Sequence, residues 1–391
     1  MIDTVRISAK GVDRVRAGHL WIYRSDLLPW DRDGAPEPGS IVSVEDKKGR
    51  PWARAFFSSE SLISLRILTT EEVEVGWDFF RQRVESAWSL RKRVVSGTEV
   101  YRVVHGEGDG LPSIVVDKYG DILCLQTLSQ GADRLKPMIV QILRDLLQPR
   151  SIIERNDTRI RSLEGLESRT AVLYGEDPGE VVCSENGLRF HFQPSSGQKT
   201  GAFLDQRENR RLLQDLAFGE GLDCFCYSGA FAIHMAKSCQ SVEGVDISES
   251  AIEQASRNAG LNDARNVKFE VDNAFDRLRL YDHLKRKFDT INLDPPAFAK
   301  SRAQVDSALR GYKEINLRAL KLLKPGGILV TSSCSQLIDE NLFLNLLVEA
   351  AADAGRQIQV VCKRSQSRDH PFLISMPETH YLKCLFLRAL N

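Results

Sequence analysis

The second half of the chain alternates between short apolar runs and amphipathic stretches with three-to-four spacing. The apolar runs lie at residues 220–227, 241–247, 267–273, 288–296 and 328–333. Buried strands that alternate with amphipathic helices are typical of a parallel sheet with helices on both faces. We therefore predict a doubly wound, Rossmann-like α/β sheet over residues 191–391. In such a sheet, ligands bind at the carboxyl ends of the strands.

The first half of the chain follows two other patterns. Residues 40–68 contain three short strand-like runs separated by turn-like segments, which predicts a β-rich domain over residues 1–70. A helical pattern begins at Asp78, and a hairpin signal, a second helix and a further strand follow it. These elements predict a central α+β domain over residues 71–190.

Composition excludes several classes of protein. The 391 residues contain 53 Lys plus Arg and 53 Asp plus Glu, so bulk charge does not hold this chain to nucleic acid, although a local basic face remains compatible. The first residues of the chain are charged, unlike a signal peptide. No run approaches the roughly 18 apolar residues that a membrane-spanning helix needs. We expect a cytoplasmic protein. None of its eight cysteines forms C-x-x-C, so we expect reduced thiols and no metal site.

Three successive predicted strands end at acidic residues. These are Asp223, Asp246 and Asp272. The loop after the first acid lacks the G-x-G-x-x-G pattern that lets a backbone approach a pyrophosphate. A cofactor without phosphates, whose amino group needs a carboxylate, suits this loop, and S-adenosylmethionine (SAM) meets that description. Besides the acids, the candidate cofactor residues are Phe225, Tyr227, Gly229, Ile247, Asn273 and Ala274.

Each acid has an expected role. Asp246 is placed to accept the two ribose hydroxyls. Asp272 is placed to accept the adenine amino group, with Phe275 or Ile247 beside the ring. The alternative is that each acid is the N-cap of the helix that follows it, since Asp is a favoured N-cap residue.

The fourth and fifth predicted strands end at LDPPAF and SSCS, which contain Asp294 and Cys334. Cytosine C5 is a poor nucleophile, and a thiolate that adds at C6 turns C5 into an enamine carbon that can accept a methyl group. A carboxyl group can assist this addition at N3, and the base must leave its stack to reach the pocket. We therefore predict Cys334 as nucleophile and Asp294 as its partner for a pyrimidine substrate. The alternative for Cys334 is a small residue that fills space at a strand end.

Taken together, these motifs resemble the ribosomal RNA large subunit methyltransferase I family. The resembling segments are residues 106–126, 154–157, 199–210, 222–236, 245–258, 293–298, 311–335 and 369–390. The resemblance implies a SAM-dependent enzyme that makes 5-methylcytidine in 23S ribosomal RNA, with Cys334 as nucleophile and a PUA domain for RNA binding over residues 1–70. It also allows for a homodimer.

The same resemblance implies that residues 199–207 help to close the site. Within them it suggests Asp205 as a cofactor contact and Lys199 and Arg207 as RNA contacts. Many RNA 5-methylcytosine enzymes have a second cysteine just after a motif like Asp-Pro-Pro, whereas this chain has Ala297. The group that removes the C5 proton is therefore open between Asp294 and water.

Two basic stretches are candidate RNA contacts. The first contains Arg6, Lys10, Arg14 and Arg16 with interleaved aromatic residues, which we expect to lie on one continuous element, a combination that suits single-stranded RNA. The second begins at Lys300 and runs to residue 324. For both, the alternative is a solvated surface without a partner.

Two rival functions remain at this point. An enzyme that methylates an exocyclic amine of guanine or adenine would use Asp294-Pro-Pro, with Phe298 stacked on the base, and would not need Cys334. A non-catalytic RNA-binding protein with a vestigial fold would not bind SAM.

Overall fold

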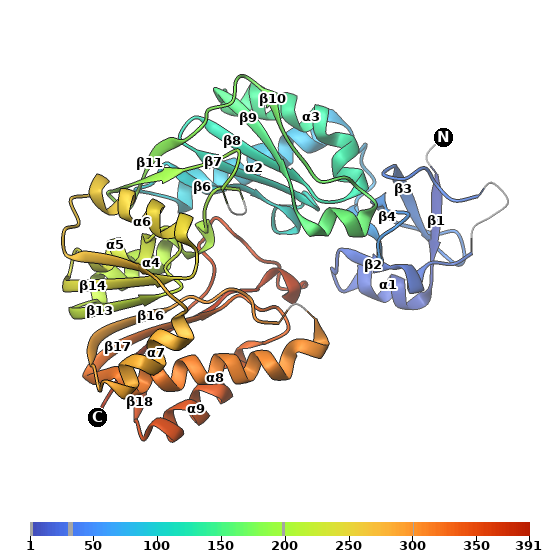
Figure 1. The fold of residues 1–391 in the computed structure, drawn as a ribbon. Coiled ribbons are helices and arrows are strands. Elements are labelled where there is room, and N and C mark those ends of the chain that lie inside the picture. The colour runs from blue at the N-terminus through green and yellow to red at the C-terminus, as the bar shows by residue number, and fades with distance from the viewer. Residues whose placement is uncertain (1–2, 30–33, 198–199, 300) are drawn as a thin grey trace. The chain divides into compact units, whose positions relative to one another are not determined.

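The computed structural model describes residues 3–29, 34–197, 200–299 and 301–391 (Figure 1). The chain divides into two compact units, each made of three chain segments. The first unit comprises Met1–Cys183, Phe192–Leu204 and Arg368–Thr379, and the second comprises Ser184–His191, Asp205–Ser367 and His380–Asn391. Within the described residues, no helix is both long enough and apolar enough to cross a membrane.

An N-terminal sheet opens the first unit. Its strands, in the order β1-β3-β4-β5-β2, are β1 (Thr4–Ile7), β2 (Trp21–Tyr23), β3 (Ile41–Asp46), β4 (Pro51–Phe57) and β5 (Ile63–Thr69). The three predicted strands are β3 to β5. Helix α1 (Ala9–Arg16) was not predicted, because only Gly11, Val12 and Val15 of its eight residues are buried and four of the other five are charged.

The first unit contains a second five-stranded sheet. Its strands, in the order β10-β9-β8-β7-β6, are β6 (Val100–His105), β7 (Ile114–Tyr119), β8 (Ile122–Thr127), β9 (Ser151–Asn156) and β10 (Arg169–Tyr174). Helices α2 (Trp77–Val94) and α3 (Gln130–Leu147) pack against each other in the same apolar core. The predicted hairpin is β7 and β8. The predicted domain boundaries at residues 70 and 190 stay a proposal, since both sheets belong to one compact unit.

A seven-stranded sheet forms the second unit, in the order β15-β14-β13-β16-β17-β19-β18. Its strands are β13 (Gly219–Cys224), β14 (Cys239–Asp246), β15 (Val267–Val271), β16 (Phe288–Leu293), β17 (Leu323–Ser333), β18 (Ile358–Arg364) and β19 (Lys383–Ala389). All neighbours are parallel except β19, which is antiparallel to both β17 and β18. The predicted doubly wound fold is confirmed.

Six helices cover the two faces of this sheet (Figure 1). They are α4 (Arg207–Leu216), α5 (Ala230–Met235), α6 (Glu249–Leu261), α7 (Ala274–His283), α8 (Val305–Leu322) and α9 (Glu340–Ala354). Helices α7, α8 and α9 share one apolar core with β13, β16 and β17, and α4 and α5 share another with β14, β17 and β19. Burial of both faces explains why the strand sequences are continuous apolar runs.

The remaining elements are short. A two-stranded sheet pairs β11 (Val181–Glu185) with β12 (Leu188–Phe192). The short 3-10 helices are η1 (Arg24–Asp26), η2 (Gly106–Asp109), η3 (Arg159–Glu164), η4 (Leu204–Gln206), η5 (Arg302–Gln304) and η6 (Pro377–Thr379).

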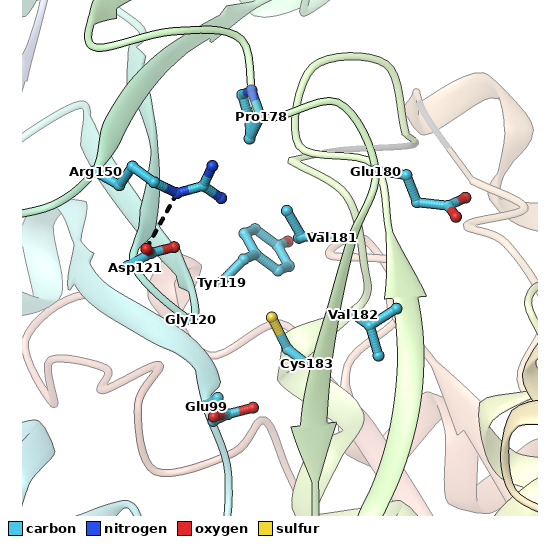
Figure 2. Close-up of a pocket in the computed structure, with 10 residues that line it drawn as sticks. All are labelled: Glu99, Tyr119, Gly120, Asp121, Arg150, Pro178, Glu180, Val181, Val182 and Cys183. Carbon is cyan, nitrogen blue, oxygen red and sulfur yellow. Dashed lines mark hydrogen bonds and ion pairs between the residues drawn. The ribbon is translucent and has the colours of Figure 1, made fainter.

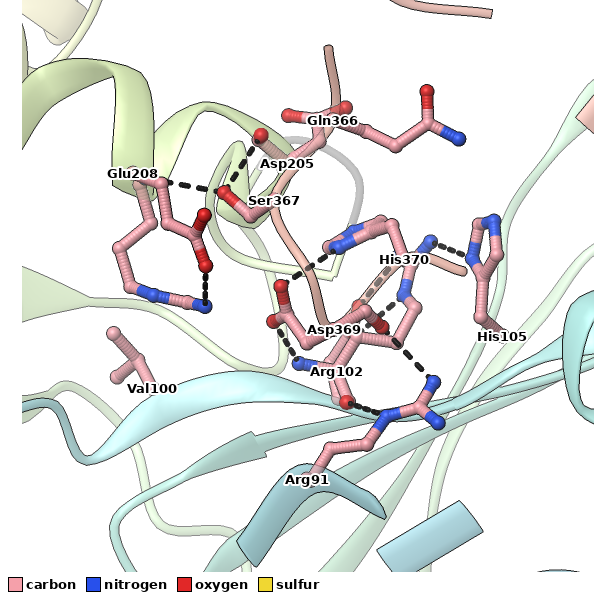
Figure 3. A network of polar contacts seen from close by, with 12 residues as sticks. Arg91, Val100, Arg102, His105, Asp205, Glu208, Gln366, Ser367, Asp369 and His370 are labelled. Atoms are coloured by element: carbon pink, nitrogen blue, oxygen red, sulfur yellow. Dashed lines mark hydrogen bonds and ion pairs between the residues drawn. The ribbon is translucent and has the colours of Figure 1, made fainter. Parts of the chain in front are cut away.

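The segment after residue 367 is anchored within the first unit by a buried polar network (Figure 3). Arg91 donates to both carboxylate oxygens of Asp109 at 2.5 and 2.6 Å and to the carbonyl of Asp369 at 2.9 Å. The carboxylate of Asp369 accepts the backbone N–H of Arg102 at 2.8 Å. Buried charges are stable only when they are paired and hydrogen-bonded. These contacts therefore hold the start of the segment, at Asp369, in one place.

Candidate active site

Asp223 lies at the end of β13 and is fully buried. One carboxylate oxygen accepts the backbone N–H of Ala232 at 2.9 Å, and the other accepts the side-chain amide of Asn292 at 2.8 Å. Burial raises the pKa of Asp223 to about 7. The hydrogen bond from Asn292 opposes this shift, and the nearby carboxylate of Asp294 reinforces it. Asp223 therefore exchanges a proton near neutral pH, which is typical of a functional site rather than a surface carboxylate.

The loop after β13 turns sharply through left-handed residues. Phe225 has φ +64°, Tyr227 has φ +48° and Gly229 has φ +79°. Such angles strain residues that have a Cβ, by roughly 1–3 kcal/mol each, and this strain is common at functional sites. A Cβ at Gly229 would lie 2.6 Å from Phe269 and 2.9 Å from Ala255, so this position accepts only glycine.

Asp246 holds this loop against the next strand. Its carboxylate accepts the backbone N–H of Tyr227 at 2.9 Å and that of Ser248 at 3.0 Å. Ile247, the residue after it, is 72% exposed at the end of β14. An apolar side chain so exposed beside a carboxylate suits the face of an adenine ring next to its ribose.

Asp272 follows β15, the strand next to β14. Its carboxylate accepts Arg277 Nε at 2.7 Å and the backbone N–H of Asn273 at 2.7 Å, and it remains one-third exposed. Asn273 begins α7 and accepts the backbone N–H of Phe275. The ring of Phe275 packs into the apolar core that α7 shares with α8, which leaves Ile247 as the better candidate beside an adenine.

The N-cap positions of α5, α6 and α7 are held by Gly229, Ser248 and Asn273. The N-cap alternative is therefore wrong for Asp246 and Asp272. Asp223 accepts the backbone N–H of Ala232 in the first turn of α5, so it fills part of a capping role from inside the sheet. The contacts of the three carboxylates with the cofactor stay a prediction.

Asp294 and Cys334 follow the neighbouring parallel strands β16 and β17, which pair Leu293 with Thr331. Gln206 bridges these two strand ends, because its side-chain amide donates to Asp294 at 2.9 Å and to Ser332 Oγ at 3.1 Å.

The amide of Gln206 is oriented by Asn209, whose side chain donates to Gln206 Oε1 at 2.6 Å. Gln206 was not predicted as a site residue, although it lies between the predicted Asp205 and Arg207. The only signal in the sequence was its place in the segment 199–210.

Two serines hold the backbone on either side of Cys334. Ser333 Oγ accepts the backbone N–H of Ser335 at 3.4 Å, and Ser335 Oγ lies 3.1 Å from the hydroxyl of Tyr312. All eight cysteines are free thiols, and Cys334 and Cys362 are the two that are not buried. A partly exposed thiol on a fixed turn is accessible to a substrate, whereas a residue that only fills space would be buried.

The segment around residue 205 is tightly held within the second unit. Asp205 accepts the hydroxyl of Tyr381 at 2.8 Å, and its carbonyl accepts the hydroxyl of Ser367 at 2.9 Å (Figure 3). The side chain of Arg207 is 2% exposed, so RNA would reach it only after this segment moved. Lys199 lies outside the described residues. The predicted roles of these three residues stay predictions.

The first basic stretch is not a single element. Arg6 lies on β1, whereas Lys10, Arg14 and Arg16 lie on α1, so our expectation of one continuous basic element is corrected. The chain turns after β1 because Ser8 caps α1. Every one of these side chains has an acidic partner: the pairs are Arg6 with Glu45, Lys10 and Arg14 with Asp26, and Arg16 with Asp13. These pairs reduce the positive charge that this surface offers to RNA.

The second basic stretch also carries ion pairs. Lys313 pairs with Glu349 and Asp353 on α9, and Arg318 pairs with Glu314 and Asp282. These contacts favour the alternative of an ordinary exposed helix face for α8. Lys300, the predicted RNA contact at its start, lies outside the described residues.

A pocket of about 450 Å³ lies elsewhere, in the first unit (Figure 2). Its wall includes Tyr119, Cys183 and an ion pair of 3.1 Å between Arg150 and Asp121. No predicted site residue lines it, and no group of three or more His, Cys, Asp or Glu within the described part of the chain is placed to hold a metal.

Comparison with known proteins identifies the family. A PUA-like domain model matches residues 5–70, and a methyltransferase domain model matches residues 220–374. A protein of Tolumonas auensis named ribosomal RNA large subunit methyltransferase I is 41% identical over 95% of this chain and 96% of its own length. One of Aeromonas hydrophila with the same name is 42% identical over 95% of each chain. The chain belongs to the ribosomal RNA large subunit methyltransferase I family.

Solved structures agree on the fold of this large subunit methyltransferase I family member. The protein SMU.776, solved in complex with S-adenosylhomocysteine, has a TM-score of 0.84 at 19% identity and covers 99% of this chain and 100% of its own. A SAM-dependent methyltransferase from Agrobacterium tumefaciens has a TM-score of 0.54 at 17% identity, covering 76% and 92%.

SAM is the cofactor of this large subunit methyltransferase I family member, and the residues at the strand ends fit it. The carboxylates of Asp223, Asp246 and Asp272 lie at neighbouring strand ends, and Ile247 exposes an apolar surface among them. The loop after β13 has no glycine pattern for phosphates. A carboxylate-rich site of this kind suits a cofactor that carries an ammonium group, a ribose and an adenine.

Proposed function

We propose that this chain transfers a methyl group from SAM to C5 of a cytidine in RNA, and that this RNA is 23S ribosomal RNA. The name shared by its relatives supports the RNA substrate, as does the PUA-like match over residues 5–70. The observation that carries the C5 chemistry is the partly exposed thiol of Cys334 beside the strand end of Asp294, with Gln206 joined to both strand ends.

Each group has a defined role in this reaction. When bound, SAM supplies the methyl group as a sulfonium electrophile. The Cys334 thiolate forms a bond to C6 of the cytosine, and the electron pair of the C5–C6 double bond moves so that C5 can attack the methyl carbon. Asp294 supports the addition by a hydrogen bond or proton at N3.

Release of the product reverses the first step. A base removes the proton from C5, the C5–C6 double bond reforms, and the electron pair of the sulfur–C6 bond returns to Cys334. Residue 297 is alanine, so a second thiol does not serve from that position. Asp294 or a water molecule takes the C5 proton, and Gln206 keeps the carboxylate of Asp294 oriented for either step.

The rival reaction at an exocyclic amine finds less support. It needs an aromatic ring to stack on the target base, and Phe298 is the candidate. The ring of Phe298 instead packs against Tyr312, with centroids 4.6 Å apart, and joins the apolar core of α8 and α9. We therefore do not propose this reaction.

A methyl-transfer assay with nucleoside analysis tests the proposal. The wild-type chain should convert cytidine in ribosomal RNA to 5-methylcytidine, and Cys334→Ala should not. Cys362→Ala is the matched control, because Cys362 is the other cysteine that is not buried. Full activity of Cys334→Ala, or a methyl group on an exocyclic amine, would overturn the proposal.

A further inference from the structure

Lys383 lies at the start of β19, directly opposite Ser333 in the antiparallel pairing with β17. Its side chain is buried, with 6% of the residue exposed. The ammonium group donates to the carbonyl of Ser335 at 2.7 Å and to the carbonyl of Tyr381 at 2.9 Å. A buried cation is therefore bound to the residue that follows Cys334.

Neither of the two acceptors of this ammonium is a carboxylate. Two of its three N–H groups are donated to carbonyl oxygens, which leaves one for a further acceptor. A buried charge that lacks an opposite charge is costly, and groups with strongly perturbed pKa values cluster at functional sites.

Electrostatics couples this lysine to the thiol. Burial lowers the pKa of Lys383 to about 8, and negative charge on Cys334 and on Asp339 raises it. Lys383 therefore stays mostly protonated at pH 7. Of these two negative charges, that of Cys334 raises the pKa of Lys383 more than that of Asp339 does.

We propose that the Lys383 ammonium holds Cys334 as a thiolate, ready to add to C6 of the target base. Lys383 is a positioning residue in this role, since it acts through Cys334. This inference rests on the proposed function, because only a nucleophilic cysteine needs to be ionised. A thiolate is the reactive form of cysteine, and a neighbouring cation increases its population at neutral pH.

The charge balance of the reaction agrees with this role. The thiol proton goes to solvent before the base binds, and Lys383 remains an ammonium throughout. When sulfur bonds C6, the negative charge moves onto the ring, where Asp294 supports N3. When the sulfur–C6 bond breaks, the charge returns to sulfur beside Lys383, so the same cation also favours release.

Other titratable groups face Cys334 from the surrounding elements. Tyr312 on α8 stays neutral at pH 7, because burial raises its pKa. Asp339 caps α9 by accepting the backbone N–H of Leu342 at 2.8 Å. Asp294 follows β16 and accepts the amide of Gln206. Lys383 is the cation among these four groups, so its removal takes away the positive charge bound to the residue after Cys334.

The test is the rate at which iodoacetamide alkylates Cys334 between pH 5.5 and 10, read peptide by peptide. In the wild-type chain, the pH at which the alkylation rate of Cys334 is half-maximal should lie below about 8.5, the ordinary pKa of a thiol. Lys383→Met should move it up by about one unit, which lowers the alkylation rate near pH 7 about tenfold, and Lys383→Arg should restore most of it. Cys362 in the same samples is the internal control, and its curve should not move.

Activity completes the test. Lys383→Met should lower kcat at pH 7, regain activity toward pH 9 and leave the Kd for SAM unchanged. An alkylation midpoint for wild-type Cys334 at or above about 8.5 would overturn the inference without any substitution. So would a Lys383→Met curve equal to that of the wild type. Should Cys334→Ala keep its activity, the proposed function fails; should it be inactive while the alkylation curves coincide, only the role of Lys383 fails.

Discussion

Replacing Asp223 with asparagine is expected to remove a pH dependence from SAM binding. The carboxylate is fully buried and has a pKa of about 7, so it changes charge inside the range in which the enzyme is assayed. If the ionised form holds the ammonium group of SAM, protonation of Asp223 weakens binding.

The magnitude follows from this pKa. With a pKa of about 7, half of the Asp223 side chains are ionised at pH 7 and about 3% at pH 5.5. The affinity for SAM should therefore fall about fifteenfold between these two pH values. His234 does not contribute to this change in affinity, because burial lowers its pKa to about 4 and it stays neutral between pH 5.5 and 7.

The free energy of unfolding should change with pH in the opposite direction to the affinity for SAM. Burial raises the pKa of Asp223 from 3.8 to about 7, so folding favours the protonated carboxyl. Its contribution to stability is greatest below pH 4 and is lost as the pH rises to 7, by up to about 4 kcal/mol. The asparagine variant should lack this loss, and the side-chain Oδ1 of Asn292, which is buried without a hydrogen bond, is available to accept its new amide.

Calorimetric titration with SAM at pH 5.5, 6.25 and 7, together with thermal unfolding of the unliganded chain, measures both effects. The wild type should show the fall in affinity, and Asp223→Asn should bind weakly with a flat profile. Equal pH profiles for the two proteins would refute the assignment of Asp223 as the group that holds the ammonium.

Three further changes test other parts of the site. Asp246→Ala should weaken SAM binding about 100-fold by calorimetry, because it removes the acceptor for the ribose hydroxyls and for two backbone N–H groups. Tyr312→Phe should lower the free energy of unfolding by about 1 kcal/mol and kcat severalfold, since the contact with Ser335 is lost while the ring packing stays; an unchanged kcat would contradict this. Arg16→Ala should reduce the slope of log affinity for RNA against log salt by about 1 if Arg16 contacts a phosphate, whereas the exposed Arg144→Ala should not.

The chain's pattern was enough to predict five of the seven strands in the sheet of the second unit, β13 to β17, and the acids at their ends, but not β18 or the antiparallel β19. Alternation of apolar runs with amphipathic helices leaves few other arrangements, and the strand ends follow from it directly. The pattern predicted the strand at 220–227 as longer than β13, which ends at Cys224. Phe225 and Tyr227 adopt left-handed angles that their residue types disfavour, so local propensity points the wrong way there.

The hydrophobic pattern could not predict the parts of the site that depend on contacts between residues far apart in the sequence. Gln206 reaches Asp294 across 88 positions, and Lys383 reaches Ser335 across 48. Neither contact follows from a motif. The contact of Lys383 needs the antiparallel strand β19 beside β17. The contact of Gln206 needs the turn before α4 to lie next to the end of β16. The ion pairs of the basic surface could not be predicted for a related reason: the acid that pairs with Lys10 and Arg14, Asp26, comes from elsewhere in the fold.

Trapping the covalent intermediate tests the central claim most directly. RNA that carries 5-fluorocytidine cannot lose a proton from C5, so an enzyme that adds a thiolate to C6 stays bound to it. The account predicts a denaturant-resistant complex of RNA and protein that needs SAM, with the nucleotide attached to the peptide that contains Cys334, and no complex with Cys334→Ala. An active enzyme that leaves no adduct on Cys334 would contradict it.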